Sequence, residues 1–341
     1  TFQLMMEDVK EGRFSPAVVY DGDTPVEYAS VPLTCYEGKG YRRETFESIS
    51  TLLENYYASR DTITRIRQKS SDLRRIVQTA LERSCKKYDL QLKQLKDTEK
   101  REKYRIYGEL LNTYGYELKG GEKSFKCINY YDNEEITIPL DPQLTARENA
   151  QKHFDKYNKL KRTYEALSQL TMETKAEVDH LESVSSALDI ALEENDLVQI
   201  KEELMEFGYV KKRRANEKRP KITSKPFHYI SSDGYDIFVG KNNYQNEELT
   251  FKVASGNDWW FHAKGIPGSH AIVKSNGQAD LPDRVFEEAG ALAAYYSKGR
   301  ENDKVEIDYI QKKNIKKVAG AAPGFVIYHT NYSLVASPRC D

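Results

Sequence analysis

The chain has 341 residues, of which 31% are charged, and its 52 basic and 53 acidic side chains leave a formal net charge of −1. This length allows about two or three domains, and no run of about 18 apolar residues that could span a membrane occurs. The four cysteines are far apart and form no CxxC pair, which argues against a zinc site or a disulfide framework and for a reducing compartment. We therefore expect a folded protein that exposes much charged helical surface.

Residues 1–40 are expected to be the end of a larger N-terminal domain. Pro16–Tyr20 and Pro25–Leu33 are typical of two strands joined by a turn at Asp21–Asp23. Because a single hairpin is only marginally stable, its partners are expected upstream. The sequence begins with Thr1 and not with methionine, which also suggests a piece of a longer protein.

Residues 41–114 and 145–208 have the periodicity of an amphipathic coiled coil. Small or apolar side chains recur at spacings of three and four between charged ones, at Leu73, Val77, Ala80, Ser84, Tyr88, Leu92 and Leu95 in the first segment and at Phe154, Tyr157, Leu160, Tyr164, Leu167, Leu170, Val178, Leu181, Val184 and Leu188 in the second. Thr145 and Glu148 form a capping-box pattern at the start of the second helix. Because each helix has one apolar stripe to bury, the two are expected to pack antiparallel.

Residues 115–144 interrupt the helical pattern and predict a small β tip, or middle domain. Gly120 and Gly121 turn the chain, and Ser124–Tyr131 and Glu135–Pro139 have the composition of strands. A hairpin turn is expected between them.

Residues 209–225 form a basic linker that contains Lys211, Lys212, Arg213 and Arg214. One interpretation is a solvated tether. The other is a strip that contacts phosphates, because basic runs bind polyanions without needing structure.

Residues 226–341 alternate strand and helix signals and predict an α+β domain that is large enough to bury its own core. The predicted elements are a hairpin at Phe227–Ile230 and Tyr235–Val239, strands at Leu249–Val253 and Ala271–Val273, a helix at Pro282–Ser297, and strands at Val305–Ile310 and Phe325–Tyr328 that complete the sheet.

His262 and His270 flank a Gly-Ile-Pro-Gly turn and are the first candidate site residues. A zinc site or a general base would need a third ligand or an acidic partner, and only Asp258 and the distant His329 are at hand. Ser269 and His270 are expected to leave the turn with their polar atoms held in fixed directions. The histidines either fix the loop by hydrogen bonds or contact phosphates and base edges, and the alternative is that they are plain structural histidines.

Trp259 and Trp260 are adjacent, so on a strand they point to opposite faces. One of them is expected in the core. The other is a candidate stacking platform for an unpaired base or an anchor for a protein partner.

A basic face is the third candidate site. Lysines surround Asn314, and three further basic residues could join them, so that the set is Lys264, Lys298, Arg300, Lys312, Lys313, Lys316 and Lys317. Acidic residues balance the basic ones in this domain, so a nucleic-acid interface requires the lysines to segregate on one face. The alternative is a solvated lysine surface.

Six segments stand out in order along the chain, namely ENAQKHFDKYNKLK at Glu148–Lys161, DGYDIFVGKNNYQNEELT at Asp233–Thr250, DWWFHAKGIPGSH at Asp258–His270, AAYYSK at Ala293–Lys298, VEIDYIQKKNIKK at Val305–Lys317 and GAAPGFVIY at Gly320–Tyr328. At these segments the chain resembles the NFACT family, which includes bacterial fibronectin/fibrinogen-binding proteins, the RqcH-type ribosome quality-control factors and the eukaryotic NEMF. The resemblance covers most of residues 40–341.

The resemblance implies an N-terminal NFACT domain, of which residues 1–40 would be a remnant, a coiled coil with a middle domain at its tip, and an RNA-binding NFACT-R domain at residues 226–341. It implies a cytoplasmic factor that binds the large ribosomal subunit RNA and tRNA in ribosome-associated quality control. Gram-positive members are also described as surface adhesins for host fibronectin or fibrinogen, which gives the alternative function and a cell-surface location without a signal peptide.

The sequence therefore predicts a mixed fold, in which a long antiparallel α-helical coiled coil with a small β tip is followed by an α+β C-terminal domain. It contains no GxGxxG or Walker pattern, so no cofactor is indicated. No nucleophile, base and orienting group are brought together, and we expect a binding module and not an enzyme.

Overall fold

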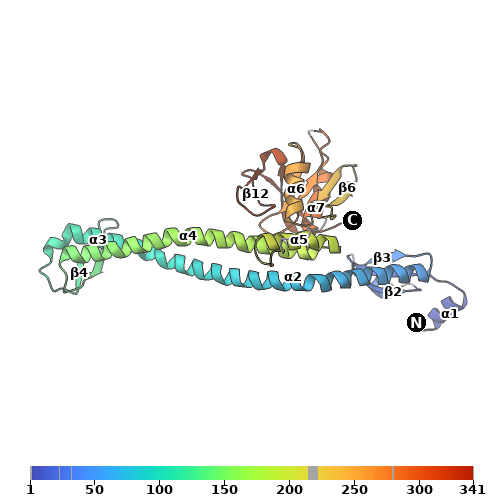
Figure 1. Ribbon diagram of the computed structural model, residues 1–341, viewed down its shortest axis with the longest axis horizontal. Helices are drawn as coiled ribbons and strands as arrows, with labels where there is room; N and C mark the ends of the chain where they lie inside the picture. The colour runs from blue at the N-terminus through green and yellow to red at the C-terminus, as the bar shows by residue number, and fades with distance from the viewer. Residues whose placement is uncertain (1, 23, 32, 214–221, 279, 341) are drawn as a thin grey trace. The chain divides into compact units, whose positions relative to one another are not determined.

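The computed structural model describes residues 2–22, 24–31, 33–213, 222–278 and 280–340. The chain divides into two compact units, one formed by residues 1–78 and 183–341 and the other by residues 79–182. Figure 1 labels the helices and strands of both. No helix in the described part of the chain combines the length and the apolar character that crossing a membrane requires.

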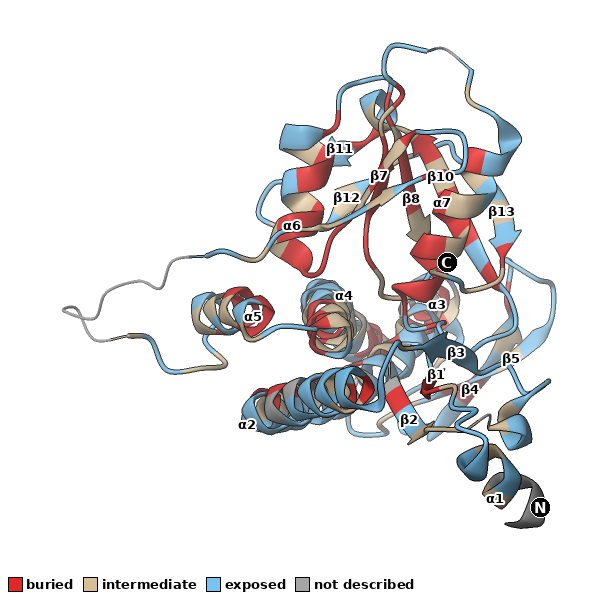
Figure 2. Cartoon of the chain, turned by 90° about the vertical axis from the view of Figure 1, so that its right-hand side faces the viewer, coloured by how far each residue is buried: buried red, intermediate tan, exposed pale blue. Residues whose placement is uncertain are grey.

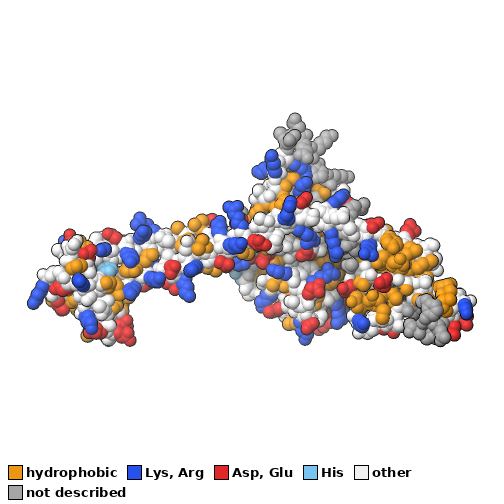
Figure 3. All heavy atoms as spheres, turned by 90° about the horizontal axis from the view of Figure 1, so that it is seen from below, with side chains coloured by type: hydrophobic (Ala, Val, Ile, Leu, Met, Phe, Trp, Pro, Cys, Tyr) orange, Lys and Arg blue, Asp and Glu red, His pale blue; other side chains and the backbone are white. Residues whose placement is uncertain are grey.

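The first unit begins with helix α1 (Phe2–Lys10) and a small sheet with the strand order β2-β1-β3. Its strands are β1 (Ala17–Asp21), β2 (Thr24–Ala29) and β3 (Arg42–Thr45), and both pairings are antiparallel. The predicted hairpin is confirmed, and its third strand follows it in the chain. Large apolar side chains remain exposed here, among them Phe14, Val26 and Tyr57, and Figure 3 shows hydrophobic groups gathered over this region.

Three helical segments of the first unit pack together, namely the beginning of α2 (Ile49–Asp97), the end of α4 (Ala146–Ile190) and α5 (Glu194–Glu206). Arg74 of α2 reaches the carbonyl of Leu188 and the carboxylate of Asp189, whereas the earlier Lys69 reaches the later Glu194. As the residue number rises along α2, the number of the residue that it contacts falls. The helix α2 therefore runs antiparallel to the segment formed by α4 and α5.

The second unit holds the rest of α2 and α4, joined through α3 (Arg101–Tyr114) and the hairpin of β4 (Ser124–Ile128) and β5 (Glu135–Pro139). The guanidinium of Arg101 lies 3.9 Å from the ring centroid of Tyr164. Further along α3, a Cβ at Gly108 would lie 2.7 Å from the ring of Phe154, so glycine lets this ring approach the helix. These pairs again show antiparallel packing, and the fold class is as predicted.

Two details of the helical prediction can be tested. The capping box is confirmed, because the Thr145 N–H donates to Glu148 Oε2 at 2.8 Å and the Glu148 N–H donates to Thr145 Oγ1 at 3.3 Å. Leu92 and Leu170 were expected in the seam but are 40% and 45% exposed, and the polar Gln91 is buried in place of Leu92.

The C-terminal domain of the first unit is built on a six-stranded antiparallel sheet with the order β13-β10-β8-β9-β7-β6. Its strands are β6 (Phe227–Ile230), β7 (Asp236–Val239), β8 (Trp259–Ala263), β9 (Ala271–Val273), β10 (Val305–Gln311) and β13 (Tyr332–Ala336). Helix α7 (Asp283–Tyr295) packs on one face through Val285, Ala289 and Ala293, which are fully buried. The other face is covered by α6 (Asn243–Glu248), the helical turn that follows it, and the short ladder of β11 (Lys316–Lys317) and β12 (Val326–Ile327).

Two strand predictions in this domain are wrong. Leu249–Val253 is a π-helical turn that continues α6, with Leu249 and Thr250 buried. Residues 325–328 do not join the main sheet, because β12 within them pairs with β11, and the sixth strand is β13 instead.

Candidate nucleic-acid interface

The candidate interface lies at the end of the main sheet where β8 begins and β10 ends. Asp258, directly before β8, is 1% exposed and organises this end. Its carboxylate accepts hydrogen bonds from the N–H groups of Ser255 at 2.7 Å and Ser275 at 2.9 Å, and from the ammonium of Lys274. Burial opposes ionisation of this carboxyl, but the Lys274 ammonium and the two N–H groups outweigh burial and lower the pKa of Asp258.

Backbone bonds bring two distant lysine-bearing segments together here. The N–H of Lys312 donates to the carbonyl of Asp258 at 2.9 Å, and the N–H of Lys313 donates to the carbonyl of Gly256 at 3.0 Å. The loop after the π-helical turn therefore lies against the segment after β10. We call four lysines in and next to these segments the lysine patch, namely Lys252 of the π-helical turn, Lys312 and Lys313 directly after β10, and Lys316 of β11.

The lysine patch lacks the compensating acids that other lysines of the domain have. Lys317 donates to Glu247 Oε1 at 2.6 Å, and Lys264 pairs with Glu306. Within the described ranges, no carboxylate lies at ion-pair distance from any of the four patch lysines, and Lys252, Lys313 and Lys316 are exposed. In the described chain, the charge of these four lysines is therefore not offset by an ion pair.

Trp260 and the two predicted histidines form a packed cluster on the α6 side of the sheet. Trp260 is 1% exposed, and its ring stacks on His262 at 5.6 Å and meets His270 edge-on at 5.1 Å. Thr250 Oγ1 lies 2.7 Å from Nδ1 of His270, and the N–H of His270 donates to Asn246 Oδ1 at 3.0 Å. The π-helical turn thus holds the histidine loop, and no group of three potential ligands in the described part of the chain suits a metal.

Burial keeps both histidines neutral. It lowers the pKa of His262 to about 4, although a hydrogen bond from the imidazole to the backbone carbonyl of Gly268 and the carboxylate of Asp308 oppose the shift. Burial also lowers the pKa of His270 well below its usual value, and the neighbouring His262 lowers it further. The enclosed His270 presents no charge to a phosphate, and hydrogen bonding within the loop is the interpretation that this geometry supports.

These shifts predict that the C-terminal domain loses stability in mild acid. A histidine whose folded pKa is depressed is protonated preferentially in the unfolded chain, so stability falls as the pH drops below about 6.5, and the part of the loss that comes from His262 ends near its folded pKa of about 4. From about pH 7.5 to 5.5 we expect a loss of about 2 kcal/mol in the free energy of unfolding, with about half of it absent in His270→Gln. Urea unfolding followed by tryptophan fluorescence measures this, because both tryptophans lie in this domain. Equal pH dependence in the two proteins would contradict the assignment.

Trp259 points to the opposite face of the sheet from Trp260, as predicted for adjacent strand residues. It is partly buried, and its ring lies 4.9 Å from that of Phe286 and 5.8 Å from that of Tyr309. The deep tryptophan is therefore Trp260, and Trp259 belongs to an aromatic group near the surface.

The remaining predicted site residues of the domain do not join the lysine patch. Ser269 is 2% exposed and bonds the carbonyl of Tyr296 through its N–H at 2.9 Å. Lys264 follows the other end of β8. Arg300 stacks on Tyr295 at 3.9 Å, and a Cβ at Gly22 would lie 3.3 Å from its guanidinium. Lys298 is exposed two residues before Arg300 and its N–H bonds the carbonyl of Pro267.

The structure describes the two ends of the basic linker, residues 209–213 and 222–225. Lys211 and Lys212 are exposed, whereas the guanidinium of Arg213 pairs with Glu202 of α5 and is 18% exposed. Arg214 lies outside the described residues.

Sequence reasoning missed a buried polar bridge between α5 and the C-terminal domain. The ammonium of Lys241 lies 3.2 Å from Asp196 Oδ1, with side chains 9% and 1% exposed. Beside this pair, Asn242 donates to Gln199 Oε1 at 2.8 Å and Asn243 donates to Glu203 Oε1 at 2.7 Å. The signal in the sequence was the run of amide side chains at the start of α6. A solvent-exposed helix start needs fewer amides, so this run could have indicated a buried polar contact.

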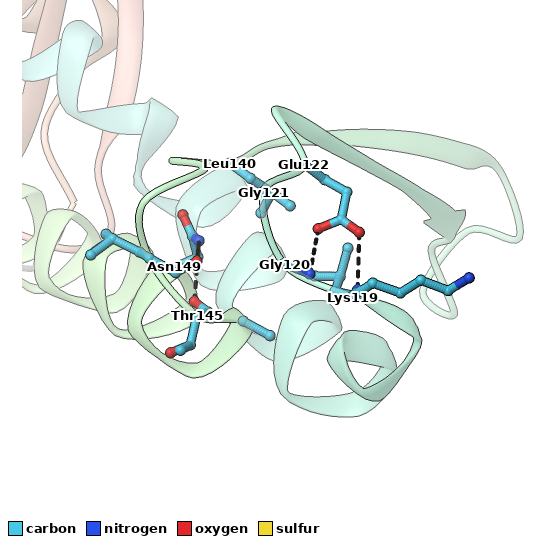
Figure 4. A pocket seen from close by; sticks show the side chains of 10 residues that line it. Lys119, Gly120, Gly121, Glu122, Leu140, Thr145 and Asn149 are labelled. Carbon is cyan, nitrogen blue, oxygen red and sulfur yellow. Dashed lines mark hydrogen bonds between the residues drawn. The ribbon is translucent and has the colours of Figure 1, made fainter.

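The described structure also has a cavity of about 150 Å³ in the second unit, next to the start of α4. Figure 4 shows how its polar groups are used. The carboxylate of Glu122 accepts the N–H groups of Lys119 and Gly120, each at 2.9 Å, and Asn149 donates to the carbonyl of Thr145 at 3.1 Å. The two N–H groups, which could otherwise bind an anion, are therefore already hydrogen-bonded within the protein.

Comparison with known proteins gives the family of the chain. Residues 1–223 match NFACT N-terminal and middle domains, and residues 225–329 match the NFACT protein RNA binding domain. The chain is 42% identical over 320 residues to the Rqc2 homolog RqcH of Streptococcus suis, covering 93% of this chain and 56% of that protein. It is 35% identical over 341 residues to the Rqc2 homolog RqcH of Bacillus subtilis, covering 99% of this chain and 58% of that protein.

Among solved structures, the chain resembles the C-terminal part of the fibronectin/fibrinogen-binding protein from Streptococcus suis. The TM-score is 0.62 at 38% identity, over 81% of this chain and 96% of that one. The chain spans just over half the length of the curated relatives that it matches. Because matched NFACT domains cover residues 1–223 and 225–329, this chain belongs to the NFACT family.

Proposed function

We propose that this chain acts in ribosome-associated quality control as a non-enzymatic RNA-binding module in the cytoplasm. The observation that carries the proposal is the lysine patch, whose four lysines form no ion pair in the described part of a domain with 13 basic and 14 acidic residues. The match of residues 225–329 to an RNA binding domain and the RqcH relatives support it. Phosphates would neutralise the patch and release counterions.

In this proposal the partners are the RNA of the large ribosomal subunit and tRNA. Residues 226–341 are the recognition domain, and residues 41–114 and 145–208 form the arm that bears the tip at residues 115–144. The exposed Lys211 and Lys212 of the linker at residues 209–225 extend the phosphate contacts. Residues 1–40 are the end of the N-terminal NFACT domain.

A salt series tests the RNA-binding proposal. For four phosphate contacts, the logarithm of the binding constant for labelled RNA should fall with the logarithm of salt concentration at a slope of about −3, which is about 60-fold between about 50 and 200 mM. Fluorescence anisotropy measures the affinity at each salt concentration. An affinity that does not change with salt would contradict binding through phosphates.

A second candidate function is adhesion to host fibronectin or fibrinogen at the cell surface. The observation in its favour is the structural likeness to the C-terminal part of the Streptococcus suis fibronectin/fibrinogen-binding protein. It predicts saturable binding of soluble fibronectin to this chain. An experiment in which RNA and soluble fibronectin compete for the chain therefore has a different expected result for each of the two functions.

A further inference from the structure

The seam between α2 and α4 contains a polar layer in the second unit. Gln91 of α2 is 7% exposed, and Thr171 and Thr174 of α4 are buried as well. Because the helices are antiparallel, counting the same number of residues back from Arg101 and forward from its partner Tyr164 places Gln91 opposite Thr174. A coiled-coil seam normally holds apolar side chains at such positions.

The hydroxyls of this layer are used within α4. The hydroxyl of Thr171 donates to the carbonyl of Leu167 at 2.6 Å. The hydroxyl of Thr174 does the same with the carbonyl of Leu170 at 2.9 Å. In the described part of the chain, Oε1 of Gln91 has no hydrogen-bond partner. A buried amide oxygen without a donor lowers the stability of the layer.

Apolar side chains beside this layer point to solvent. Leu92, which directly follows Gln91, is 40% exposed. Leu170 and Met172, on either side of Thr171, are 45% and 70% exposed. One exposed leucine is ordinary, but here polar side chains are inside and apolar ones outside, which is the reverse of an amphipathic helix.

Two different seams suit the sequence at this level. On α2, Tyr88 and Leu95 are partly buried and flank the layer. Either Gln91 or Leu92 divides the interval between them into steps of three and four residues, as a coiled coil requires. On α4 the flanking residues are Leu167 and Thr174, and the alternatives are Thr171 and Leu170. A local rotation smaller than the roughly 100° between neighbouring helix residues exchanges the two seams.

Opposing contributions bring the two seams close in free energy. The present seam keeps a seven-residue repeat, because Ser84, Gln91 and Thr98 are all buried. The alternative seam buries two leucines and returns the unpaired amide to water, and both changes favour it. Figure 2 shows that α2 is exposed over much of its surface, so the seam is the main restraint on the rotation of this helix.

We infer that α2 and α4 exchange between two seams in this layer, one with Gln91 and Thr171 inside and the other with Leu92 and Leu170 inside. Two packings of one sequence that are close in free energy form a conformational switch. Both helices lead from this layer to α3 and the β4–β5 hairpin, so the exchange turns that end of the second unit about the helix axes. The inference concerns the coiled coil and is independent of the proposed RNA binding.

Disulfide trapping in the full chain tests the exchange, with the four native cysteines replaced by serine. The pair Gln91→Cys with Thr171→Cys reports the present seam, and the pair Leu92→Cys with Leu170→Cys reports the alternative seam. Both pairs lie at one level, because a step of one residue in opposite directions on antiparallel helices keeps the level. Cysteine packs as a small apolar side chain, so both seams remain available.

The matched control is Lys93→Cys with Gln169→Cys, whose residues are exposed and belong to neither seam. A disulfide needs Cα atoms within about 7 Å, so we expect this pair to stay reduced. The present-seam pair should close fastest. The alternative-seam pair should close about 10- to 1000-fold more slowly, which corresponds to a minor state of about 10% to 0.1%. Peptide mass mapping over a time course measures the three rates.

Gln91→Leu separates rotation from local unfolding. Added to the alternative-seam pair, it removes the unpaired amide from the present seam and should slow disulfide formation about tenfold. Gln94→Leu, the same change at an exposed position of α2, should leave the rate unchanged. If the alternative-seam pair closes no faster than the control pair, or if Gln91→Leu does not slow it, the coiled coil has a single seam and the inference is wrong.

Discussion

Charge reversal of two patch lysines, Lys313→Glu with Lys316→Glu, is expected to weaken RNA binding about 30-fold at about 0.1 M salt. Each lysine that no longer meets a phosphate removes about one unit from the slope of log affinity against log salt. The double variant should therefore be much less sensitive to salt as well as weaker. Both residues are exposed and form no ion pair within the described chain, so their replacement should leave the fold intact. Fluorescence anisotropy with labelled RNA over a salt series measures both the affinity and the slope of log affinity against log salt.

The matched control is Lys304→Glu with Arg339→Glu, which changes the charge of the same domain equally. Both of these residues are exposed, and they lie outside the lysine patch. This variant should keep most of the affinity and most of the salt slope. If the two double variants lose affinity equally, general charge and not the lysine patch attracts the RNA.

Asp196→Ala is expected to destabilise the protein by about 3 to 5 kcal/mol, because it leaves the buried ammonium of Lys241 without its carboxylate. The carboxylate of Asp196 also accepts the N–H groups of Leu192 at 3.1 Å and Glu193 at 3.0 Å at the start of α5, and the hydroxyl of Ser224 at 2.6 Å. Removal of one side chain thus breaks the cap of a helix and the buried bridge to the C-terminal domain. Urea unfolding at neutral pH, followed by circular dichroism and tryptophan fluorescence, measures the loss.

Two further variants separate the bridge from a general effect of losing charge. The combined Asp196→Leu and Lys241→Met variant removes both charges and should be more stable than Asp196→Ala, because no charge is left buried alone. Arg284→Ala, which breaks the more exposed pair with Glu288, should cost less than about 1 kcal/mol. A cost for Asp196→Ala as small as that of Arg284→Ala would contradict the role of the bridge.

Most of the fold could be predicted because its signals are local. The seam of α2 and α4 and the capping box at Thr145 follow from spacings within a few residues. Leu249–Val253 failed because its alternating apolar and polar residues also suit a strand, and five residues do not separate the two periods. Its helical form depends on burying Leu249 and Thr250 against the sheet, which is a tertiary contact.

The candidate site could be predicted only as a set of residue types. The sequence marks Lys312, Lys313 and Lys316 as a cluster, but it does not show that the segment after Lys252 hydrogen-bonds to them. It also does not show that burial would enclose His270.

Co-sedimentation with purified large ribosomal subunits tests the central proposal most directly. The chain and the Lys313→Glu/Lys316→Glu variant would be pelleted with subunits across a salt series, with soluble fibronectin as competitor. The account predicts salt-sensitive pelleting that the double variant weakens and fibronectin does not disturb. No pelleting at low salt, with fibronectin retained by the chain in solution, would contradict it and favour the adhesin.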